Sequence, residues 1–335
     1  MDEAKRLGTG GECLRMPQDL LVGHRLVGLL AILLGVSLVV GLRPEGQAGQ
    51  TGLESPEWGE LEKVADGLSF PEGPAWDGKD TLYVSNCNGD WITKIGPEGA
   101  GVFLRASTQP FTFQKTNGLA VFRDGSLFAC DFGEGAIVKI SPGGQSEVYA
   151  EGFGGQPFRR PNDLAFDPEG NLYFTDPHAY RGENPDGTLY RVGAETREVT
   201  PVATGLAFPN GLAFSADAKQ LYVCESALHR IVRFDVQSDG GLGAPEVFAE
   251  LPGGDPDGIH FDRAGRLYVA HFGGGAVWVL SPNGSLEHRI PLPGKKPSNV
   301  VFAGEDLRTL YITECETNAV YRLRVETPGL PLFSS

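Results

Sequence analysis

The segment FPEGPAW, from Phe70 to Trp76, is the first of six similar segments that decide the fold. The other five read TNGLAVF, RPNDLAF, FPNGLAF, DPDGIHF and PSNVVFA, and each joins an oxygen-bearing side chain to a short apolar strand. These side chains, called the anchor residues below, recur every 42 to 48 residues and are Glu72, Asn117, Asn162, Asn210, Asp257 and Asn299. A period of this length with strand patterns and no helical periodicity is typical of the four-stranded blade of a β-propeller. The chain is therefore predicted to be all-β, a six-bladed β-propeller with four-stranded blades.

The propeller is expected to be one domain at residues 56–326 of the 335-residue chain, followed by a C-terminal tail at residues 327–335. Each anchor residue follows a short strand-like piece, and the piece before Glu72, LEKVADGL, has no blade before it in the sequence. We expect this piece to form the outer strand of blade six. The first strand and the last three would then share one sheet, which leaves no exposed edge.

The N-terminal part differs in kind from the propeller. Residues 26–42 read LVGLLAILLGVSLVVGL without a charge, residues 1–25 carry Lys and Arg, and residues 43–55 form a linker rich in Gly, Glu and Gln. Seventeen apolar residues after a positive flank predict either a transmembrane signal anchor or an export signal, with Ala48 near the cleavage point in the second case. Both alternatives place the propeller outside the cytoplasm, in a periplasmic, secreted or lumenal setting, and the uncleaved form would remain attached to the membrane.

Charge and cysteine content limit the function classes. The formal net charge of −15 and the pI near 4.9 argue against nucleic acid as a partner, because phosphates would be repelled. Cys87 and Cys315 occupy equivalent positions in blades one and six, which are neighbours once the ring closes. A disulfide needs Cα atoms within about 7 Å, which the spacing of equivalent strands does not favour, so their pairing stays open.

The anchor residues stand at the start of the innermost strands, which should converge on one mouth of the central channel. Asn beside Gly or Pro is also a turn former, and for Asn117 and Asn299 this alternative stays open. Glu72 does not fit the turn interpretation, since a carboxylate at a crowded mouth is costly without a partner. Two carboxylates, Glu72 and Asp257, among carboxamides are hard oxygen ligands that suit one calcium ion, with another divalent metal left open.

A second set of polar residues ends the second strand of each blade and should return to the same mouth. Its members are Asn86, Asp131, Asp176, Glu225, His271 and Glu314. The alternative is that polar residues merely cap strand ends beside water. His271 is a candidate general base, because histidine titrates near neutral pH.

The residues resemble the senescence marker protein 30/gluconolactonase/luciferin-regenerating enzyme family of six-bladed propellers, and more distantly diisopropyl fluorophosphatase and the paraoxonases. FPEGPAW is similar to the family's EGP segment, which implies a metal-binding role for Glu72. The Asn-Asp and Asn-Gly segments imply the same role for Asn162 and Asn210. DPDGIHF is similar to the PDG segment, whose aspartate touches the metal and serves as base or nucleophile, here Asp257. Arg160 matches an arginine that contacts polyol substrates in some members.

These observations predict a calcium-dependent hydrolase of ester bonds, a lactonase of gluconolactonase type that opens a sugar lactone or another lactone. Calcium would be held by Glu72, Asn162, Asn210 and Asp257. Asp257 and His271 are the catalytic candidates, and the substrate-binding candidates are Arg160, Asn117 and Asn299. The alternative is a non-catalytic extracytoplasmic propeller that binds a ligand or partner and keeps calcium for structure.

Overall fold

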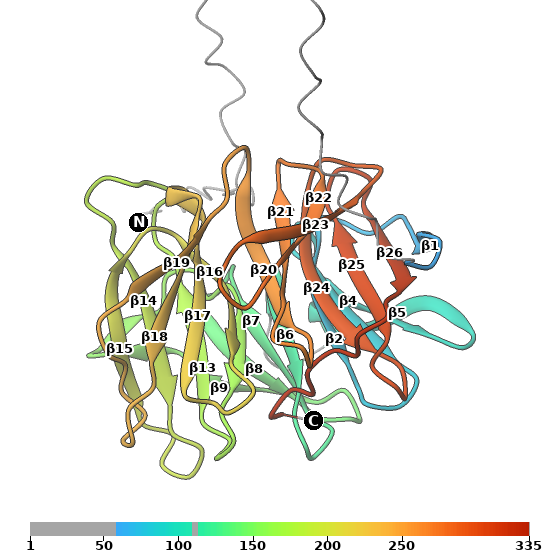
Figure 1. Ribbon diagram of the computed structural model, residues 1–335. Coiled ribbons are helices and arrows are strands. Elements are labelled where there is room, and N and C mark those ends of the chain that lie inside the picture. The colour runs from blue at the N-terminus through green and yellow to red at the C-terminus, as the bar shows by residue number, and fades with distance from the viewer. Residues whose placement is uncertain (1–57, 109–112, 335) are drawn as a thin grey trace, which may run out of the picture. The chain divides into compact units, whose positions relative to one another are not determined.

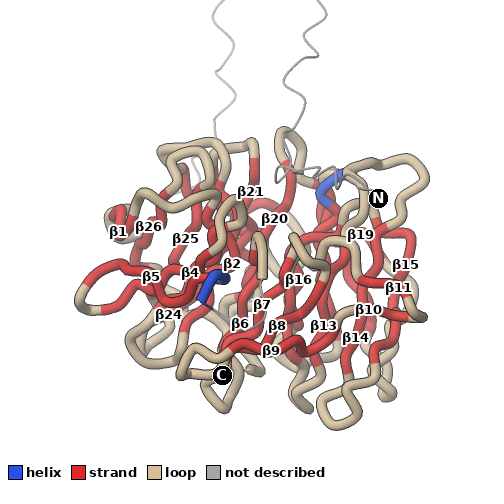
Figure 2. Tube along the Cα trace, turned by 180° about the vertical axis from the view of Figure 1, so that it is seen from behind, coloured by secondary structure: helices blue, strands red, loops and turns tan. Residues whose placement is uncertain are grey.

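The computed structural model describes residues 58–108 and 113–334, and this part of the chain forms six four-stranded antiparallel sheets (Figure 1). The prediction of an all-β, six-bladed propeller is therefore confirmed. Helix is confined in the described ranges to two 3-10 turns, η1 (Ala106–Thr108) and η2 (Ser226–Leu228) (Figure 2). No helix within these ranges is long and apolar enough to cross a membrane. The predicted membrane or signal segment, residues 26–42, lies outside them.

Each of the first three blades is built from strands that follow one another along the chain, innermost strand first. Blade one comprises β2 (Pro71–Trp76), β3 (Leu82–Asn86), β4 (Trp91–Gly96) and β5 (Gly99–Arg105). Blade two comprises β6 (Thr116–Val121), β7 (Leu127–Asp131), β8 (Ala136–Ile140) and β9 (Ser146–Ala150). A small hairpin of β10 (Gly152–Phe153) and β11 (Gln156–Pro157) leads to blade three. Blade three comprises β12 (Leu164–Phe166), β13 (Leu172–Asp176), β14 (Gly187–Val192) and β15 (Val199–Leu206).

The last three blades repeat this order, except that the outer strand of blade six comes from the start of the propeller. Blade four comprises β16 (Pro209–Phe214), β17 (Gln220–Glu225), β18 (Arg230–Asp235) and β19 (Glu246–Glu250). Blade five comprises β20 (Asp255–Phe261), β21 (Leu267–Phe272), β22 (Ala276–Leu280) and β23 (Leu286–Pro291). Blade six comprises β24 (Pro297–Ala303), β25 (Thr309–Glu314), β26 (Ala319–Arg324) and β1 (Glu62–Ala65).

The closure of the ring agrees with the prediction for LEKVADGL. Strand β1 pairs antiparallel with β26, and Glu62 lies opposite Arg322 while Ala65 lies opposite Val320. The Arg322 side chain also donates a hydrogen bond to Glu62 at 2.9 Å. Blade six therefore joins strands from both ends of the propeller and covers the edge that β26 would otherwise expose.

The core is divided among the blades. Six buried apolar clusters lie between neighbouring blades, one for each of the six contacts around the ring. Between blades one and six, for example, Leu82 and Val84 pack against Val301 and Val320. Each fully buried side chain of this kind contributes about 1.5 to 3 kcal/mol. Every blade is thus stabilised mainly by its two neighbours, which holds the six innermost strands around a common channel.

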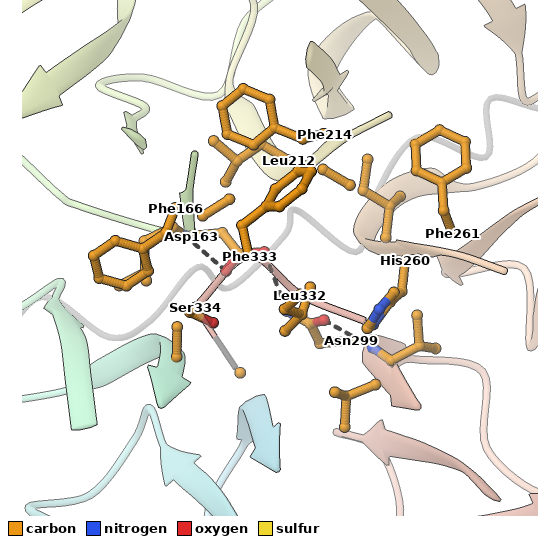
Figure 3. A pocket seen from close by; sticks show the side chains of 18 of the residues that line it. Asp163, Phe166, Leu212, Phe214, His260, Phe261, Asn299, Leu332, Phe333 and Ser334 are labelled. Atoms are coloured by element: carbon orange, nitrogen blue, oxygen red, sulfur yellow. Dashed lines mark hydrogen bonds between the residues drawn. The ribbon is translucent and has the colours of Figure 1, made fainter. Parts of the chain in front are cut away.

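The C-terminal tail crosses the end of the channel at which the innermost strands finish. Gly329 pairs with Asp262, and the backbone N–H of Leu330 donates to the carbonyl of Phe261 at 2.9 Å. His260 Nε2 lies 3.0 Å from the Leu330 carbonyl oxygen, and Arg123 Nη2 donates to the Phe333 carbonyl at 2.7 Å. Figure 3 shows the tail among the aromatic side chains that line this cavity. The sequence predicted a tail at residues 327–335 but no place for it.

Candidate functional site

The six anchor residues are all buried, with 4 to 8% of their surface exposed. Five of them lie in the first three residues of the innermost strands β2, β6, β16, β20 and β24, and Asn162 lies two residues before β12. The innermost strands contact one another in sequence around the channel. The anchors therefore occupy equivalent positions near one mouth, opposite the end that the tail covers.

Glycine after the anchor allows neighbouring blades to approach closely. A Cβ atom at Gly73 would lie 2.2 Å from the carbonyl oxygen of Asn117, and one at Gly258 would lie 2.0 Å from Cγ of Asn299. Distances this short are far inside van der Waals contact, so only glycine fits at these positions. The Gly that follows Glu72 and Asp257 in the sequence thus brings the next anchor residue into place.

Hydrogen bonds between blades complete the ring. The N–H of Gly118 donates to the Asn162 carbonyl at 2.7 Å, and Thr175 Oγ1 donates to the Asn210 carbonyl at 2.9 Å. Blade six is tied to blade one by Ser298 Oγ, which donates to the Pro71 carbonyl at 2.7 Å. The backbone at the anchors is therefore fixed by neighbours on both sides.

The backbone just before three of the anchors is strained. Phe70, Lys115 and Phe208 each have φ near 55°, in the left-handed region that side chains other than Gly, Asn and Asp seldom adopt. Each stands two residues before an anchor residue, namely Glu72, Asn117 or Asn210. Strain of this kind costs on the order of 1 to 3 kcal/mol and clusters at functional sites. This supports a functional rather than a purely structural origin for the ring.

The two carboxylates of the ring, Glu72 and Asp257, both influence the pKa of the Cys315 thiol. Burial raises the pKa of the Cys315 thiol well above its ordinary value, and the nearby carboxylates of Glu72 and Asp257 raise it further. In residues 58–108 and 113–334, no group of three or more His, Cys, Asp or Glu side chains is arranged to hold a metal. The predicted ligand set differs from such a group, since it combines two buried carboxylates with carboxamide oxygens. Donors of that kind fit a hard cation such as calcium.

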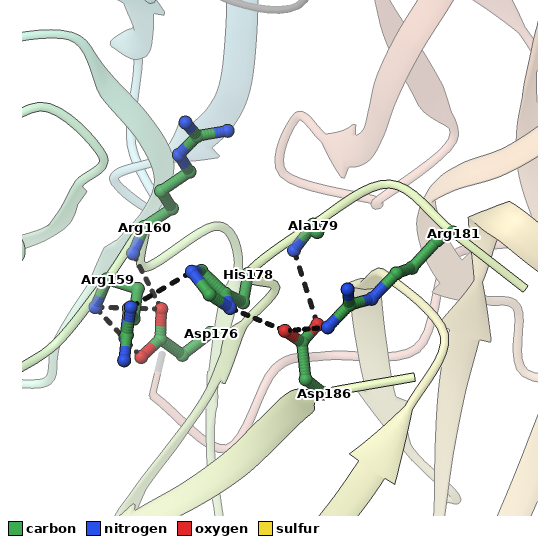
Figure 4. A network of polar contacts seen from close by, with 7 residues as sticks. All are labelled: Arg159, Arg160, Asp176, His178, Ala179, Arg181 and Asp186. Atoms are coloured by element: carbon green, nitrogen blue, oxygen red, sulfur yellow. Dashed lines mark hydrogen bonds and ion pairs between the residues drawn. The ribbon is translucent and has the colours of Figure 1, made fainter. Parts of the chain in front are cut away.

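The second set of polar residues has a structural role that repeats in every blade. Each of the six is at most 4% exposed and bonds to the loop that enters the innermost strand of its own blade. In five of the six, a side-chain oxygen accepts a hydrogen bond from a backbone N–H group of that loop. The accepting residue and the donor are Asn86 and Ser69, Asp131 and Gln114, Asp176 and both Arg159 and Arg160 (Figure 4), Glu225 and Ala207, and Glu314 and Lys296. They are therefore not the water-exposed strand-end caps of the alternative interpretation, because they are buried and bind the protein backbone. These bonds hold the loops that lead into the anchor residues.

His271 belongs to this set, but its side chain faces a backbone carbonyl oxygen instead of an N–H group. Its Nε2 lies 3.3 Å from the carbonyl oxygen of Leu251, in the loop before β20. The ring packs on Trp278 with centroids 4.4 Å apart, and Nδ1 has no hydrogen-bond partner among the described residues. Burial lowers the pKa of His271. The candidate base therefore sits beneath the loop that precedes Asp257.

Asn299 and Asn117 use their side chains within the protein. Asn299 Oδ1 accepts from the N–H of Val300 at 2.8 Å, and its Nδ2 lies 3.4 Å from Oδ2 of Asp163. Asn117 Nδ2 lies 3.9 Å from the sulfur of Cys87. The local backbone bond of Asn299 is the kind that the turn interpretation expects. Cys87 and Cys315 are both buried free thiols.

Asp163 is a buried carboxylate that the sequence analysis did not single out. It lies with Asn299 in the lining of the channel cavity, a space of about 70 Å³ whose other walls are largely apolar (Figure 3). Burial raises the pKa of Asp163 to about 7, although the N–H of Leu164 and the amide of Asn299 oppose this shift. The only feature of the sequence that could have pointed to Asp163 is its place directly after the anchor residue Asn162.

A second missed group lies near Asp257 on blade five. Asp255 is 7% exposed, and its Oδ1 lies 2.8 Å from Nδ1 of His229. Burial and the nearby carboxylate of Asp255 raise the pKa of Tyr180 above its ordinary value. Tyr180 comes from the loop at residues 177–186, called the blade-three loop, which is longer than the corresponding turns of the other blades, so the periodic pattern could not predict that it approaches His229 and Asp255.

Comparisons with known proteins agree with this architecture. A model of the family described as "SMP-30/Gluconolactonase/LRE-like region" matches residues 70–316. A 6-deoxy-6-sulfogluconolactonase of Pseudomonas putida is 33% identical over 78% of this chain and 94% of its own, and a gluconolactonase of Zymomonas mobilis is 31% identical over 80% and 82%. The solved structure of a gluconolactonase from Xanthomonas campestris has a TM-score of 0.70 and 30% identity, over 81% of this chain and 90% of its own. The chain belongs to the SMP-30/Gluconolactonase/LRE-like family.

Proposed function

We propose that the protein is a calcium-dependent lactonase of gluconolactonase type, which hydrolyses the ring ester of a sugar lactone. The observation that carries the proposal is the ring of buried oxygen donors around Glu72 and Asp257, held by glycine contacts and strained backbone. Relatives named gluconolactonase and 6-deoxy-6-sulfogluconolactonase match most of their own length and support this activity.

The proposed ligands are Glu72, Asn162, Asn210 and Asp257. Calcium held there would polarise the lactone carbonyl and stabilise the negative charge that develops on its oxygen. Asp257 is proposed to act on water as a base or to attack the carbonyl itself, since it is the anchor carboxylate on blade five beside the Gly that admits Asn299. Arg160 is exposed at the start of the same segment as Asn162 and is proposed to bind substrate hydroxyl groups.

The hydrophobic segment at residues 26–42 is proposed to export the propeller, so that the reaction takes place outside the cytoplasm. The lactone would then be met in a periplasmic, secreted or lumenal compartment.

The test is a screen of glucono-1,5-lactone, homoserine lactones, aryl esters and phosphotriesters, with calcium and with chelator. We expect lactone hydrolysis that chelator abolishes and calcium restores. Glu72→Gln should need more calcium for half-maximal activity and should lose most of the thermal stabilisation that calcium gives, since a ligand that binds only the folded state raises its stability.

Glu62→Gln, on the exposed strand β1, is the matched control and should leave the calcium dependence unchanged. Hydrolysis that is equally fast in chelator would contradict the calcium-dependent mechanism. Tight calcium binding without turnover of any substrate would favour the non-catalytic propeller.

A further inference from the structure

Two phenylalanine rings from different blades meet near the anchor residues. Phe70 stands two residues before Glu72 on blade one, and Phe272 is the last residue of β21 on blade five. Phe272 lies opposite Asp255, the first residue of β20, in the strand pairing. The ring centroids of Phe70 and Phe272, called the aromatic pair below, are 6.2 Å apart, and both residues are partly exposed. These two side chains are in contact although their blades are not neighbours in the ring.

The place of this contact follows from the circular arrangement of the blades. Blade six lies between blades one and five, so a straight line that joins the inner strands of those two blades passes on the channel side of blade six. Lys296 belongs to the loop that enters blade six, and its Nζ lies 5.7 Å from the centre of the Phe272 ring. The backbone N–H of Phe70 donates to Oδ1 of Asn318, in the turn between β25 and β26, at 3.0 Å. The aromatic pair therefore lies over blade six, at the mouth where the anchor residues are.

The two carboxylates of the proposed site lie beside the same blade. Cys315 directly follows β25 of blade six, and both Glu72 and Asp257 raise the pKa of its thiol. The sulfur of Cys315 also lies 3.4 Å from the carbonyl oxygen of Pro71, the residue between Phe70 and Glu72. The aromatic pair and the two carboxylates are therefore gathered around the same end of blade six.

The conformation of Phe70 indicates a role beyond packing. Its φ of 55° is in the left-handed region, which is costly for a bulky side chain. Phe208 has the same φ at the equivalent place in blade four, but it is only 3% exposed and packs on Tyr180 with ring centroids 5.3 Å apart. Burial of the ring offsets the strain at Phe208, whereas the ring of Phe70 remains partly exposed at the mouth. Strain without full burial is typical of residues that contact a ligand.

We propose that the aromatic pair forms an apolar wall of the active site and binds an apolar group that the lactone carries beside its ring ester. This inference rests on the proposed lactonase function and extends its substrate class from sugar lactones to lactones with an alkyl substituent. The anchor residues would bind the polar ester, while the wall would bind the apolar remainder. This division is typical of small-molecule sites, in which apolar and aromatic side chains provide most of the contact and a few polar groups fix the orientation.

The experiment compares δ-decalactone with δ-hexalactone, which share the lactone ring and differ by four methylene groups in the alkyl chain next to the ring oxygen. The measured quantity is the ratio of their kcat/KM values. Both substrates are assayed on one sample, so the ratio does not depend on the folded fraction. A fully buried methylene group is worth about fourfold in kcat/KM, and a wall that covers one side of the chain gives roughly half of that free energy. The wild-type ratio should therefore exceed about 10.

Phe70→Asn and Phe272→Asn should each lower this ratio at least about threefold. Asn tolerates the left-handed region, so Phe70→Asn keeps the backbone path to Glu72. Leu307→Asn is the matched control, since Leu307 is a partly exposed apolar residue with a φ of 54° in the turn between β24 and β25, at the other end of blade six. It should keep the wild-type ratio. A wild-type ratio near 1, or a ratio that either Phe variant leaves unchanged, overturns the wall, as does an equal loss in Leu307→Asn.

If neither lactone is hydrolysed, the lactonase proposal fails and the wall is tested by binding alone. The probe is N-phenyl-1-naphthylamine, a neutral apolar dye whose fluorescence rises in apolar surroundings. The wild-type protein and Leu307→Asn should bind it with equal affinity, and Phe70→Asn and Phe272→Asn should bind it at least about tenfold more weakly. Equal binding by the wild-type protein and the two Phe variants, or no binding to the wild-type protein, overturns the wall.

Discussion

Asp257 is the residue whose chemistry matters most to the proposed function. Asp257→Asn keeps the shape and an oxygen ligand but removes a charge and any basic or nucleophilic role. We expect kcat to fall by at least roughly 100-fold, as is typical for the loss of a positioned base, while calcium binding persists at reduced affinity. The measurement is kcat at saturating calcium.

Near-normal turnover of that variant at saturating calcium would remove Asp257 from catalysis. His271 would then be the next residue to test, although its Nε2 is engaged with the Leu251 carbonyl.

His260 should make the stability of the protein dependent on pH. It is fully buried, and burial lowers its pKa from 6.5 to about 4, while the bond to the Leu330 carbonyl partly opposes this. Because the unfolded chain takes up a proton at higher pH than the folded one, this stability is complete above pH 6.5 and is lost as the pH falls towards 4. His260→Gln should remove roughly 2 to 3 kcal/mol of the difference in free energy of unfolding between pH 8 and pH 4.5.

Denaturant titrations of both proteins at the two pH values would measure this. An identical pH dependence in the variant would contradict the assignment. Asp131 and Asp163, whose pKa values burial raises to about 7, act in the opposite direction in both proteins and cancel in the comparison.

Among the elements, the C-terminal tail has the clearest independent role. It caps the channel through the backbone bond of Leu330 to Phe261 and the bond that the Arg123 side chain donates to the Phe333 carbonyl, and it fills part of an apolar cavity. Deletion of residues 330–335 should lower the free energy of unfolding by roughly 2 to 4 kcal/mol, from lost apolar burial and hydrogen bonds. Arg123→Ala, which removes the bonds to the Phe333 and Pro168 carbonyls but leaves the tail in place, should cost less than the deletion. Equal melting temperatures for the deletion and the full chain would show that the tail does not stabilise the blades.

The elements also show why part of the site was predictable. The anchor residues recur with the blade period, so their convergence follows from the symmetry of the fold. The same symmetry predicted the place of β1 in blade six, because its strand-like segment has no blade before it in the sequence. The role of the outer polar set could not be predicted, because Asp131 or Glu314 at a strand end is equally suited to water or to backbone N–H groups. Only the path of the loop that enters the innermost strand decides between them.

The tail and the blade-three loop could not be predicted for the opposite reason. Both depart from the repeat, and their contacts, such as that of Tyr180 with Phe208, join segments with no periodic relation. In the sequence, Arg159 and Arg181 are only polar loop residues. Their contacts with His178 and Asp186 become visible only in the folded structure (Figure 4).

At the scale of the whole molecule, the predicted export of the propeller can be tested by glycosylation of one surface residue, Asn283. Asn283 begins the sequon Asn283-Gly284-Ser285, and it is exposed in the turn between β22 and β23. In a host with a glycosylating secretory pathway, the full chain should carry a glycan there, detected as a mass shift that glycosidase removes. Asn283→Gln should abolish the shift. An unmodified, cytosol-facing propeller in such a host would overturn the predicted topology.

The pairing of β1 with β26 has a consequence for biosynthesis. Glu62 and Arg322 are 260 residues apart, so the ribosome must make nearly the whole propeller before β1 can meet its partner. At about 5 to 20 residues per second this delay lasts roughly 13 to 52 seconds. During that interval the nascent chain has no closed ring and its first strand is unpaired. Blades one to five can each pair their own strands earlier, so closure of the ring is the step that waits for the last blade.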